Sequence, residues 1–375
     1  MIFENCCTFP YCLLFLLTFI SCTSTDIKKI VVDPRKAISI DCKKNLSDYS
    51  SIQLETTEAS RMANPGKLII TDSSFVILDN TLNQLFFFDI KNGHFLNKIM
   101  PPDSSTIVDQ SYDPATHQVQ LLSVNKKLTL YSLREDGGNL NLHSLPDAIL
   151  NLAGPGIYNY NDYWVFDRNS LNYDGNNIAF FEKKSFKFIK STISIPAMFK
   201  GGYVPVSRLL NTYRDTLFYL PPLKDTIFAI DRSLKAEPAY NITIVKGGVP
   251  KKVVDNYHYD GTQKSPILLL KEKRYIWQFD NFLQTENFIY FSVGINNIAT
   301  GLFYDKSNHK SFLVNSSLPD SVDKRNFSFP AAVYKNLFVS LFYSRELGGV
   351  FNMRAGGLPK LEKNPTVLFF AINFN

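Results

Sequence analysis

The chain has 375 residues, of which 45% are hydrophobic and 14% aromatic, a composition that excludes a disordered or collagen-like polypeptide and predicts a globular protein with a sizeable core. Forty Lys and Arg against 34 Asp and Glu give a net charge of +6. This small excess is spread along the sequence and forms no basic block, so nucleic acid is not an expected partner.

The N-terminal region predicts export and attachment to a membrane. Residues 11–20 form an apolar run of ten, shorter than the ~20 residues of a membrane-spanning helix and typical of a signal peptide. Ser21-Cys22 follows, a small residue directly before a cysteine, which resembles the lipobox of bacterial lipoproteins. We expect a signal peptide over 1–21, lipidation of Cys22 and a tether over 22–45. The first ten residues contain Glu4 but no Lys or Arg, which is unusual for an export signal, and an uncleaved anchor is the alternative.

Cysteine usage agrees with export. Cys6, Cys7 and Cys12 would leave with the signal peptide, and Cys22 would carry the lipid. Cys42 is then alone, so no internal disulfide can form, and we expect it to be a partly buried small residue.

Beyond residue 45, short runs of β-branched and aromatic residues alternate with Asn, Asp, Gly, Ser and Lys, a pattern that predicts β-strands. The clearest unit is a meander of four predicted strands, at residues 67–70, 75–79, 85–89 and 95–99. Asn92-Gly93 separates the last two and favours a type I′ turn, in which both central residues have positive φ.

The same unit recurs along the chain. Five further strand pairs are predicted, at residues 119–122 and 128–131, 163–167 and 178–181, 216–220 and 226–230, 288–291 and 301–304, and 337–340 and 367–370. A four-stranded sheet cannot cover both of its faces alone. Six such sheets therefore predict an all-β, six-bladed β-propeller of four-stranded antiparallel blades over residues 46–375.

The last predicted blade lacks an outer strand, because the chain ends shortly after it. Residues 51–55 could supply that strand, so we expect an N-terminal strand to pair with the last blade, which closes the ring and removes a free sheet edge. Two β-sandwiches in tandem are the alternative, but no linker rich in Pro or Ser divides the chain.

Two stretches carry a family resemblance. The first is Ile52-Gln53-Leu54-Glu55-Thr56-Thr57, and the second combines Phe88-Asp89, Gly93, Phe95-Leu96 and Lys98-Ile99. They resemble the six-bladed, NHL-like β-propeller lipoproteins of Bacteroidetes-type bacteria, over about residues 45–375. The resemblance implies a periplasmic or surface lipoprotein of the outer membrane, in a family mostly without assigned activity and sometimes encoded near carbohydrate-uptake systems. No acidic run follows Cys22, which favours the periplasmic side over the cell surface.

The sequence contains no motif of a familiar catalytic or metal centre. Its five histidines are scattered over different repeats without an HExxH pair, and neither GxSxG nor GxxxxGK[ST] occurs. The loop from Asp167 to Asp174 lacks the alternating oxygen ligands of a calcium loop, because Leu171 and Tyr173 interrupt it. We therefore expect no cofactor and no metal.

Two loops combine aromatic rings with polar side chains, which suits a carbohydrate because the C–H face of a sugar stacks on a ring while its hydroxyls bind polar groups. The second loop belongs to a long insertion, about residues 246–273, and long loops on rigid scaffolds often carry binding sites. The candidate ligand-binding residues of the two loops are Tyr160, Tyr163, Trp164, Tyr257, Tyr259, Arg274 and Trp277. Burial between blades is the alternative for both tryptophans.

Two functions fit these features. The favoured one is a monomeric, lipid-anchored and non-catalytic propeller that binds a glycan, a peptide or a protein partner at one rim of the central channel. The alternative is a periplasmic or surface glycan lyase or hydrolase on the same scaffold, with Tyr257, His258 and Arg274 as acid, base and charge-stabilising residues. Catalysis would require His258 and Arg274 to meet at the channel mouth.

Overall fold

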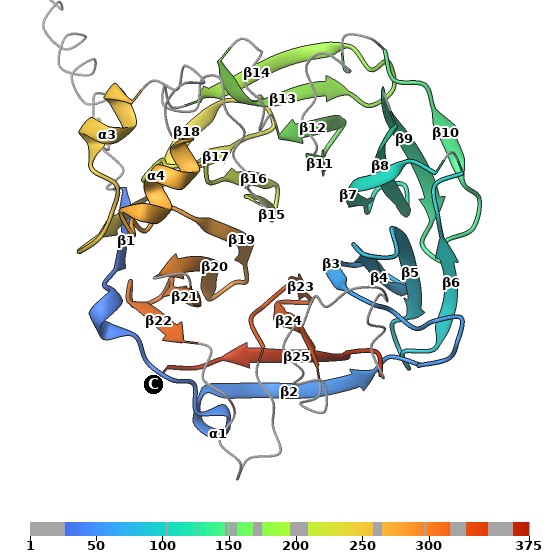
Figure 1. Ribbon diagram of the computed structural model, residues 1–375, viewed down its shortest axis with the longest axis horizontal. Helices are drawn as coiled ribbons and strands as arrows, with labels where there is room; N and C mark the ends of the chain where they lie inside the picture. Colours follow the sequence, from blue (N-terminus) through green and yellow to red (C-terminus); the bar gives the residue numbers. More distant parts are fainter. Residues whose placement is uncertain are drawn as a thin grey trace, which may run out of the picture.

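Six antiparallel sheets stand around a common axis in the computed structural model, which confirms the predicted six-bladed β-propeller (Figure 1). The structure describes residues 27–102, 104–125, 127–146, 149, 156–167, 175–195, 209–257, 265–295, 298–315, 328–343 and 363–374. The predicted signal peptide and Cys22 lie outside these residues. No helix among the described residues is long and apolar enough to cross a membrane.

Each blade is a meander whose first strand lies nearest the axis (Figure 1). In chain order the blades consist of β3 (Pro65–Ile70), β4 (Ser74–Asp79), β5 (Gln84–Asp89) and β6 (Phe95–Ile99); β7 (Thr106–Asp113), β8 (Gln118–Asn125), β9 (Lys127–Arg134) and β10 (Asn141–His143); β11 (Gly156–Tyr160), β12 (Tyr163–Asp167), β13 (Asn176–Glu182) and β14 (Phe188–Ser194); β15 (Leu210–Tyr213), β16 (Thr216–Tyr219), β17 (Thr226–Ile230) and β18 (Ala236–Ile244); β19 (Phe279–Gln284), β20 (Phe288–Ile295), β21 (Ile298–Asp305) and β22 (Ser311–Asn315); and β23 (Ala332–Tyr334), β24 (Leu337–Phe342) and β25 (Thr366–Ile372).

The sixth blade takes its outer strand from the N-terminal part of the chain, as predicted. Strand β2 (Leu46–Gln53) runs antiparallel to β25, with Ile52 opposite Val367. The ring is therefore closed by hydrogen bonds between two segments that lie more than 300 residues apart in the sequence, and this pairing removes the free edge of β25.

The segment expected to be a tether packs on the ring instead. Strand β1 (Lys28–Val32) pairs parallel to β18 and becomes a fifth strand of the fourth blade. Ile30 and Val32 point inward and are fully buried, which explains why a stretch of only five residues is held there. The 3-10 helix η1 (Pro34–Lys36) and helix α1 (Cys42–Asn45) then lead to β2, and Cys42 is buried as expected.

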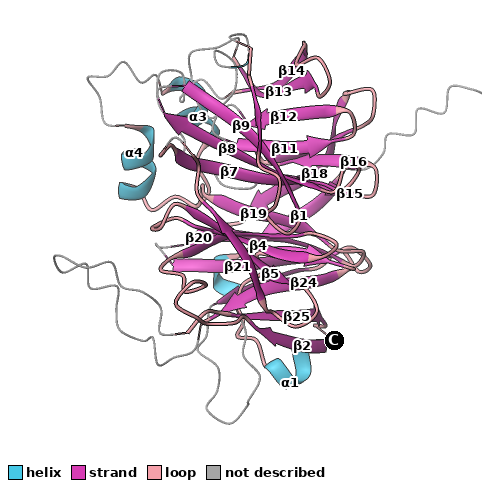
Figure 2. Cartoon of the chain, turned by 90° about the vertical axis from the view of Figure 1, so that its right-hand side faces the viewer, coloured by secondary structure: helices cyan, strands magenta, loops and turns pink. Residues whose placement is uncertain are grey.

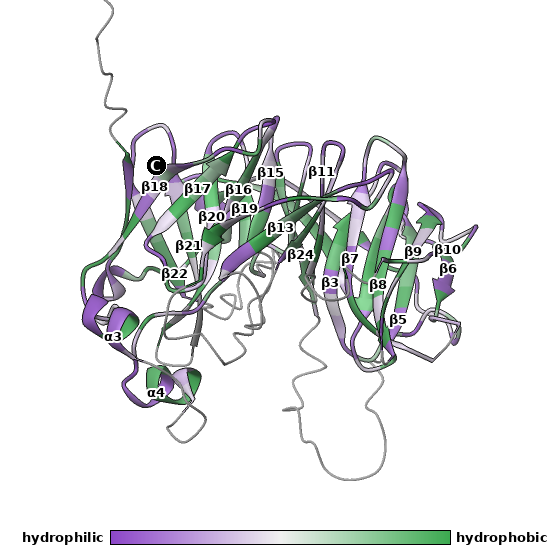
Figure 3. Cartoon of the chain, turned by 90° about the horizontal axis from the view of Figure 1, so that it is seen from above, coloured by the Kyte–Doolittle hydropathy of each residue, from purple (hydrophilic) through white to green (hydrophobic). Residues whose placement is uncertain are grey.

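The two faces of the ring differ. We call one the turn face: it carries the turns between the first and second and between the third and fourth strands of each blade, such as 89–94 and 113–118. The other, the loop face, carries the connections between blades, including α3 (Lys251–Asn256) and α4 (Pro266–Glu272). Figure 3 shows α3 and α4 on one face and the C-terminus on the opposite one, and Figure 2 shows the same separation for α4.

The turn after β5 differs from the predicted type I′ hairpin. Gly93 has a φ of 73°, but Asn92 does not have positive φ. Instead Asp89 organises a longer turn: its Oδ1 accepts hydrogen bonds from Lys91 N at 2.8 Å and Asn92 N at 3.2 Å, and its carbonyl accepts one from Gly93 N at 2.9 Å. The acidic residue at the end of the strand thus supplies the turn geometry that the Asn-Gly pair suggested.

The core lies between neighbouring blades. Aromatic side chains from facing sheets meet there, and the seam where the ring closes shows the arrangement: Phe75 of the first blade and Phe369 of the last have ring centroids 5.9 Å apart. Both belong to one buried cluster with Leu54, Phe86 and Val367. Packing between sheets therefore reinforces the closure that β2 and β25 make by hydrogen bonding.

Candidate binding site in the central channel

The central channel contains a cavity of about 1160 Å³. Its lining follows the inner strands of the ring, from Gly66 near the loop face to Arg214 at the turn face. Most of its contributors on β7, β11 and β15 are polar, and they include Gln110, Asn159 and Asn211. A cavity of this size, with polar groups converging from several blades, has the dimensions of a small-ligand site.

Charged side chains in the lining are paired across blade boundaries. Lys67 of the first blade lies 2.5 Å from Asp109 of the second, and Lys183 of the third lies 2.6 Å from Asp113 of the second. All four side chains are at most 20% exposed, so salt in the solvent screens the attraction within these pairs less than it would at the surface. The first pair joins the inner strands of the first and second blades, and the second joins the inner strand of the second blade to the turn after β13 of the third.

Asp167 has no such cationic partner among the described residues. It is the last residue of β12, opposite Gly156, the first residue of β11. Because Gly156 has no side chain, Asp167 lines the channel although it belongs to a second strand, and it is only 6% exposed. An added Cβ at residue 156 would lie 3.2 Å from the Cβ of Asp167. Gly156 thus forms a recess at the loop-face end of the channel.

The first blade shows what an aspartate does elsewhere at this position. Asp79 ends β4 opposite Pro65, as Asp167 ends β12 opposite Gly156. The carboxyl of Asp79 accepts hydrogen bonds from four backbone N–H groups, those of residues 63, 64, 81 and 82, at 2.5 to 2.9 Å. Among the described residues, by contrast, the Oδ1 atom of Asp167 is buried and has no hydrogen-bond partner.

The surroundings of Asp167 favour its neutral form. Burial raises the pKa of this carboxyl from 3.8 to about 7, the negative charge of Asp109 acts in the same direction, and the Tyr219 hydroxyl beside it acts in the opposite one. The Tyr219 hydroxyl is itself buried without a hydrogen-bond partner in the described part of the chain. A buried acid and a buried phenol therefore lie next to each other and interact, and burial together with Asp167 raises the pKa of the Tyr219 hydroxyl.

Three amide side chains of the lining also have unused acceptors. Gln110 Oε1, Asn159 Oδ1 and Asn211 Oδ1 are buried and accept no hydrogen bond within the described ranges. The amide nitrogen atoms of Gln110 and Asn159 are used: the first donates to Lys67 O at 2.8 Å, and the second to Ser111 Oγ at 2.9 Å. Within the described ranges, three amide side chains of the wall thus keep an acceptor oxygen without a donor.

The aromatic residues predicted on the third blade do not form an exposed platform. Tyr160 is 2% exposed, and its hydroxyl donates to the carbonyl oxygens of Asp215 and Ile230 at 3.0 Å each. Trp164 is buried on β12, within a cluster between the second and third blades. Tyr163 is half-buried with its ring edge-on to Phe180. All three flank the turn between β11 and β12, on the turn face: Tyr160 ends β11, and Tyr163 and Trp164 begin β12.

The residues predicted on the long insertion lie on the opposite face. Trp277 is buried against Leu270 of α4, and Tyr257 packs partly buried against the same small cluster. Arg274 is exposed at the end of α4 and does not belong to the cavity lining. Tyr259 and the alternative catalytic residue His258 lie outside the described residues. The two predicted aromatic groups are therefore separated by the thickness of the ring, and the structure does not bring them together.

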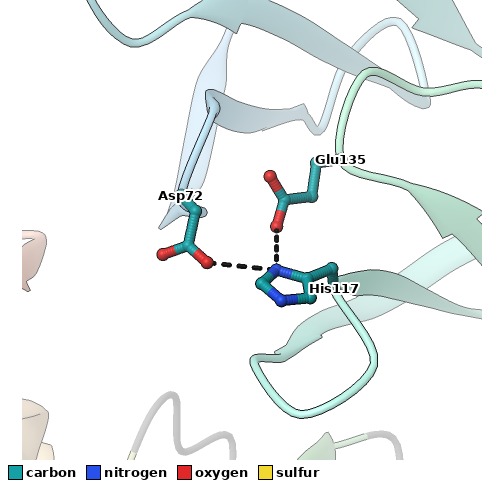
Figure 4. Close-up of side chains that lie close together, drawn as sticks. All are labelled: Asp72, His117 and Glu135. Carbon is teal, nitrogen blue, oxygen red and sulfur yellow. Dashed lines mark hydrogen bonds and ion pairs between the residues drawn. The ribbon is translucent and has the colours of Figure 1, made fainter.

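One group among the described residues has the composition of a metal site. His117 Nδ1 lies 3.1 Å from Asp72 Oδ2 and 3.2 Å from Glu135 Oε1, and the three side chains converge on the turn face (Figure 4). Burial raises the pKa of Glu135, but hydrogen bonds from Ser73, Tyr112 and His117 outweigh it and lower the pKa overall. Since these contacts already satisfy the group, we interpret it as a polar link between the first two blades.

Sequence reasoning missed Asp167 as a member of the channel. The residue was visible as the end of a predicted strand, but its access to the channel depends on Gly156, which stands opposite it only once the strands are paired. A glycine that begins an inner strand is the one signal that could have indicated the recess.

Comparison with solved structures finds one with a TM-score high enough to show the same fold, and others that are less similar. The protein named "Putative exported protein" from Bacteroides fragilis NCTC 9343 is 16% identical, with a TM-score of 0.69, over 92% of this chain and 99% of that one. A DUF4221 family member from Bacteroides vulgatus is 10% identical with a TM-score of 0.48, over 89% and 99% of the two chains. Virginiamycin B lyase from Staphylococcus aureus is 12% identical with a TM-score of 0.41, over 72% and 75%. The last two scores are too low to bear on function.

The sequence itself identifies the family. A comparison with curated proteins finds no match. The family described as "Domain of unknown function (DUF4934)" matches residues 29–368, a range that begins in β1 and ends in β25 and so includes all six blades. The chain therefore belongs to the DUF4934 family.

Proposed function

We propose that this protein is an exported, lipid-anchored binding protein whose central channel accepts a small polar ligand, with a short glycan as the favoured class. The observation that carries the proposal is the channel cavity of about 1160 Å³, whose polar wall residues include several with a buried oxygen that has no donor among the described residues. A buried acceptor left without a donor costs about 1–3 kcal/mol. A ligand that brings donors into the channel would recover part of that free energy.

A glycan suits this wall because each sugar hydroxyl both donates and accepts hydrogen bonds. Stacking is a smaller contribution than the sequence suggested, since Tyr160, Trp164 and Trp277 are buried in the protein. We therefore place the ligand inside the channel near Asp167 and the amides of Asn159 and Asn211, and not on an aromatic rim. Binding without catalysis remains our preferred function, because Arg274 does not line the cavity.

Export and anchoring are supported by the signal-like N-terminus and by the name of the Bacteroides fragilis protein of the same fold. The position of β1 adds an orientation to the anchor. Strand β1 runs parallel to β18 and so starts at the turn face. Cys22 precedes Lys28 by six residues, a length that spans at most about 20 Å. A lipid on Cys22 would hold the turn face toward the membrane and leave the loop face directed away from it.

A glycan-array screen of the full-length chain, purified in detergent, tests the proposed function. We expect a restricted set of glycans to bind, and unlabelled glycan from that set to compete. The test variant is Asn211→Leu, which replaces a channel amide by an apolar side chain of similar size. It should reduce the binding signal without unfolding the protein. An absence of binding by the folded wild type, or binding that Asn211→Leu leaves unchanged, would contradict the proposal.

A further inference from the structure

The carboxylates of the channel differ in one respect. Asp109, Asp113 and Asp215 each have a cationic partner within the protein: Lys67 at 2.5 Å, Lys183 at 2.6 Å and Arg232 at 3.0 Å. Asp167 has none in the described part of the chain, although it is only 6% exposed and reaches the cavity. Three carboxylates of the channel are thus paired with a cation, whereas Asp167 is not paired within the described ranges.

The position of Asp167 makes this exception specific. Both carboxyl oxygens of Asp79, its counterpart in the first blade, accept hydrogen bonds from backbone N–H groups, four in all. Asp167 Oδ1, by contrast, has no hydrogen-bond partner in the described part of the chain, and the absent side chain of Gly156 places the residue at the cavity wall. A buried carboxyl with no cationic partner among the described residues is costly.

We infer that the recess formed by Gly156 and Asp167 is a subsite for a primary ammonium group of the channel ligand, such as that of an amine-bearing sugar. This inference deepens the proposed function and rests on it. The ammonium would donate hydrogen bonds to Asp167 and supply the missing positive charge. Asn159 and Asn211 would accept hydrogen bonds from the rest of the ligand.

The charge of the recess also depends on pH. The groups that face Asp167 are Asp109, itself paired with Lys67, and the Tyr219 hydroxyl. Because burial raises the pKa of Asp167 to about 7, the carboxyl is largely neutral at pH 5.5 and largely ionised at pH 8 in the absence of ligand. An alkyl ammonium with a pKa near that of lysine is charged at both pH values. Its affinity should therefore rise between pH 5.5 and pH 8.

The test uses a panel of 2-aminoethyl glycosides of the common hexoses and the same panel with the amine acetylated, which keeps the sugar and removes the charge. Binding to the full-length protein is measured by ligand-observed NMR and by calorimetry at pH 8. For at least one sugar we expect the amine to bind ten-fold more tightly or better than its acetylated form, equivalent to about 1.4 kcal/mol. Asp167→Asn should abolish that preference, and Asp136→Asn, at an exposed turn, should retain it.

Each outcome has a distinct meaning. Equal affinity for amine and acetylated forms, or a preference that survives Asp167→Asn, overturns the ammonium subsite and leaves channel binding intact. If no amine in the panel binds while neutral glycans bind on the array, the subsite is likewise overturned. If neither the panel nor the array shows binding, both the subsite and the proposed function fail.

Discussion

Gly156 stands directly opposite Asp167 at the loop-face ends of β11 and β12, and its missing side chain is what exposes the carboxyl to the channel. The same register position in the first blade pairs Pro65 with Asp79, whose carboxyl is fully occupied by backbone N–H groups. The same register position therefore caps the backbone in the first blade and lines the channel in the third.

The first prediction concerns stability and Asp167. Its folded-state pKa is raised from 3.8 to about 7, so the folded protein holds this proton more tightly than the unfolded chain. The resulting stability is fully present below about pH 4 and is lost as the pH rises through 7. Asp167→Asn cannot ionise and escapes this loss. Relative to wild type, the variant should gain about 2–4 kcal/mol in free energy of unfolding between pH 4.5 and pH 8.

Chemical denaturation at the two pH values measures this change. The control Asp136→Asn removes an exposed carboxylate in a surface ion pair with Arg134 and should change by less than about 0.5 kcal/mol. A difference between Asp167→Asn and wild type that stays constant with pH would show that the carboxyl is not held neutral in the fold.

The second prediction concerns Asn364, which joins the start of β25 to the segment before β3. Its Nδ2 donates to Glu55 O at 2.7 Å and Ser60 O at 2.8 Å, and its Oδ1 accepts from Met62 N at 3.0 Å. Asn364→Leu removes these partners from Ser60 O and Met62 N, whereas Glu55 O keeps a hydrogen bond from Ser60 Oγ at 2.8 Å, and should cost about 2 kcal/mol or more in denaturant unfolding. Asn364→Asp keeps the acceptor but loses both donors, so it should destabilise as well. Wild-type stability in either variant would refute this role.

The third prediction tests the closure of the ring. Phe369 packs on Phe75 across the seam, and Phe369→Ala should lower the free energy of unfolding by about 3–5 kcal/mol, because the substitution leaves a cavity between the first and last blades. Leu142→Ala, on a strand edge with 64% exposure, is the control and should cost less than about 0.5 kcal/mol. Guanidinium titrations followed by tryptophan fluorescence compare them. Equal effects would mean that the seam contributes little to stability.

The fourth prediction concerns the anchor. Radioactive palmitate should label the wild-type chain and should not label Cys22→Ser. In vesicles with spin-labelled lipids, a fluorophore on Lys310→Cys at the turn face should be quenched more strongly than one on Leu268→Cys of α4, whereas buried Cys42 should not react with the dye. Palmitate incorporation with equal quenching at the two positions would support the lipid anchor but contradict the proposed orientation. Stronger quenching at residue 268 would mean that the loop face lies toward the membrane.

Most of the fold could be predicted because it depends on local patterns. Runs such as 85–89 and 226–230 combine β-branched or aromatic residues with turn residues at both ends, and each became a central strand of a blade. The closure was predictable because the last blade was one strand short. The pairing of β1 with β18 was not predictable. Strand β1 has only five residues and two buried side chains, so its sequence cannot be told from that of a linker unless its partner strand is known.

The site was less predictable, for a related reason. Aromatic residues indicate both binding platforms and blade cores, and the sequence alone cannot separate the two: Trp164 proved to be core, and Tyr160 spends its hydroxyl on two carbonyls. The polar wall of the channel is assembled from residues of several blades, such as Gln110, Asn159 and Asn211. No local spacing records that convergence.

The proposed function depends most on whether a ligand enters the recess of the channel. The direct measurement is calorimetric titration of the best array glycan into wild type, Gly156→Leu and Asn211→Leu, each first shown to be folded by its thermal unfolding transition. Leucine at residue 156 would fill the recess, so the account predicts at least a ten-fold loss of affinity in both variants. Unchanged affinity in the two folded variants would place the ligand elsewhere and contradict the proposed binding in the channel.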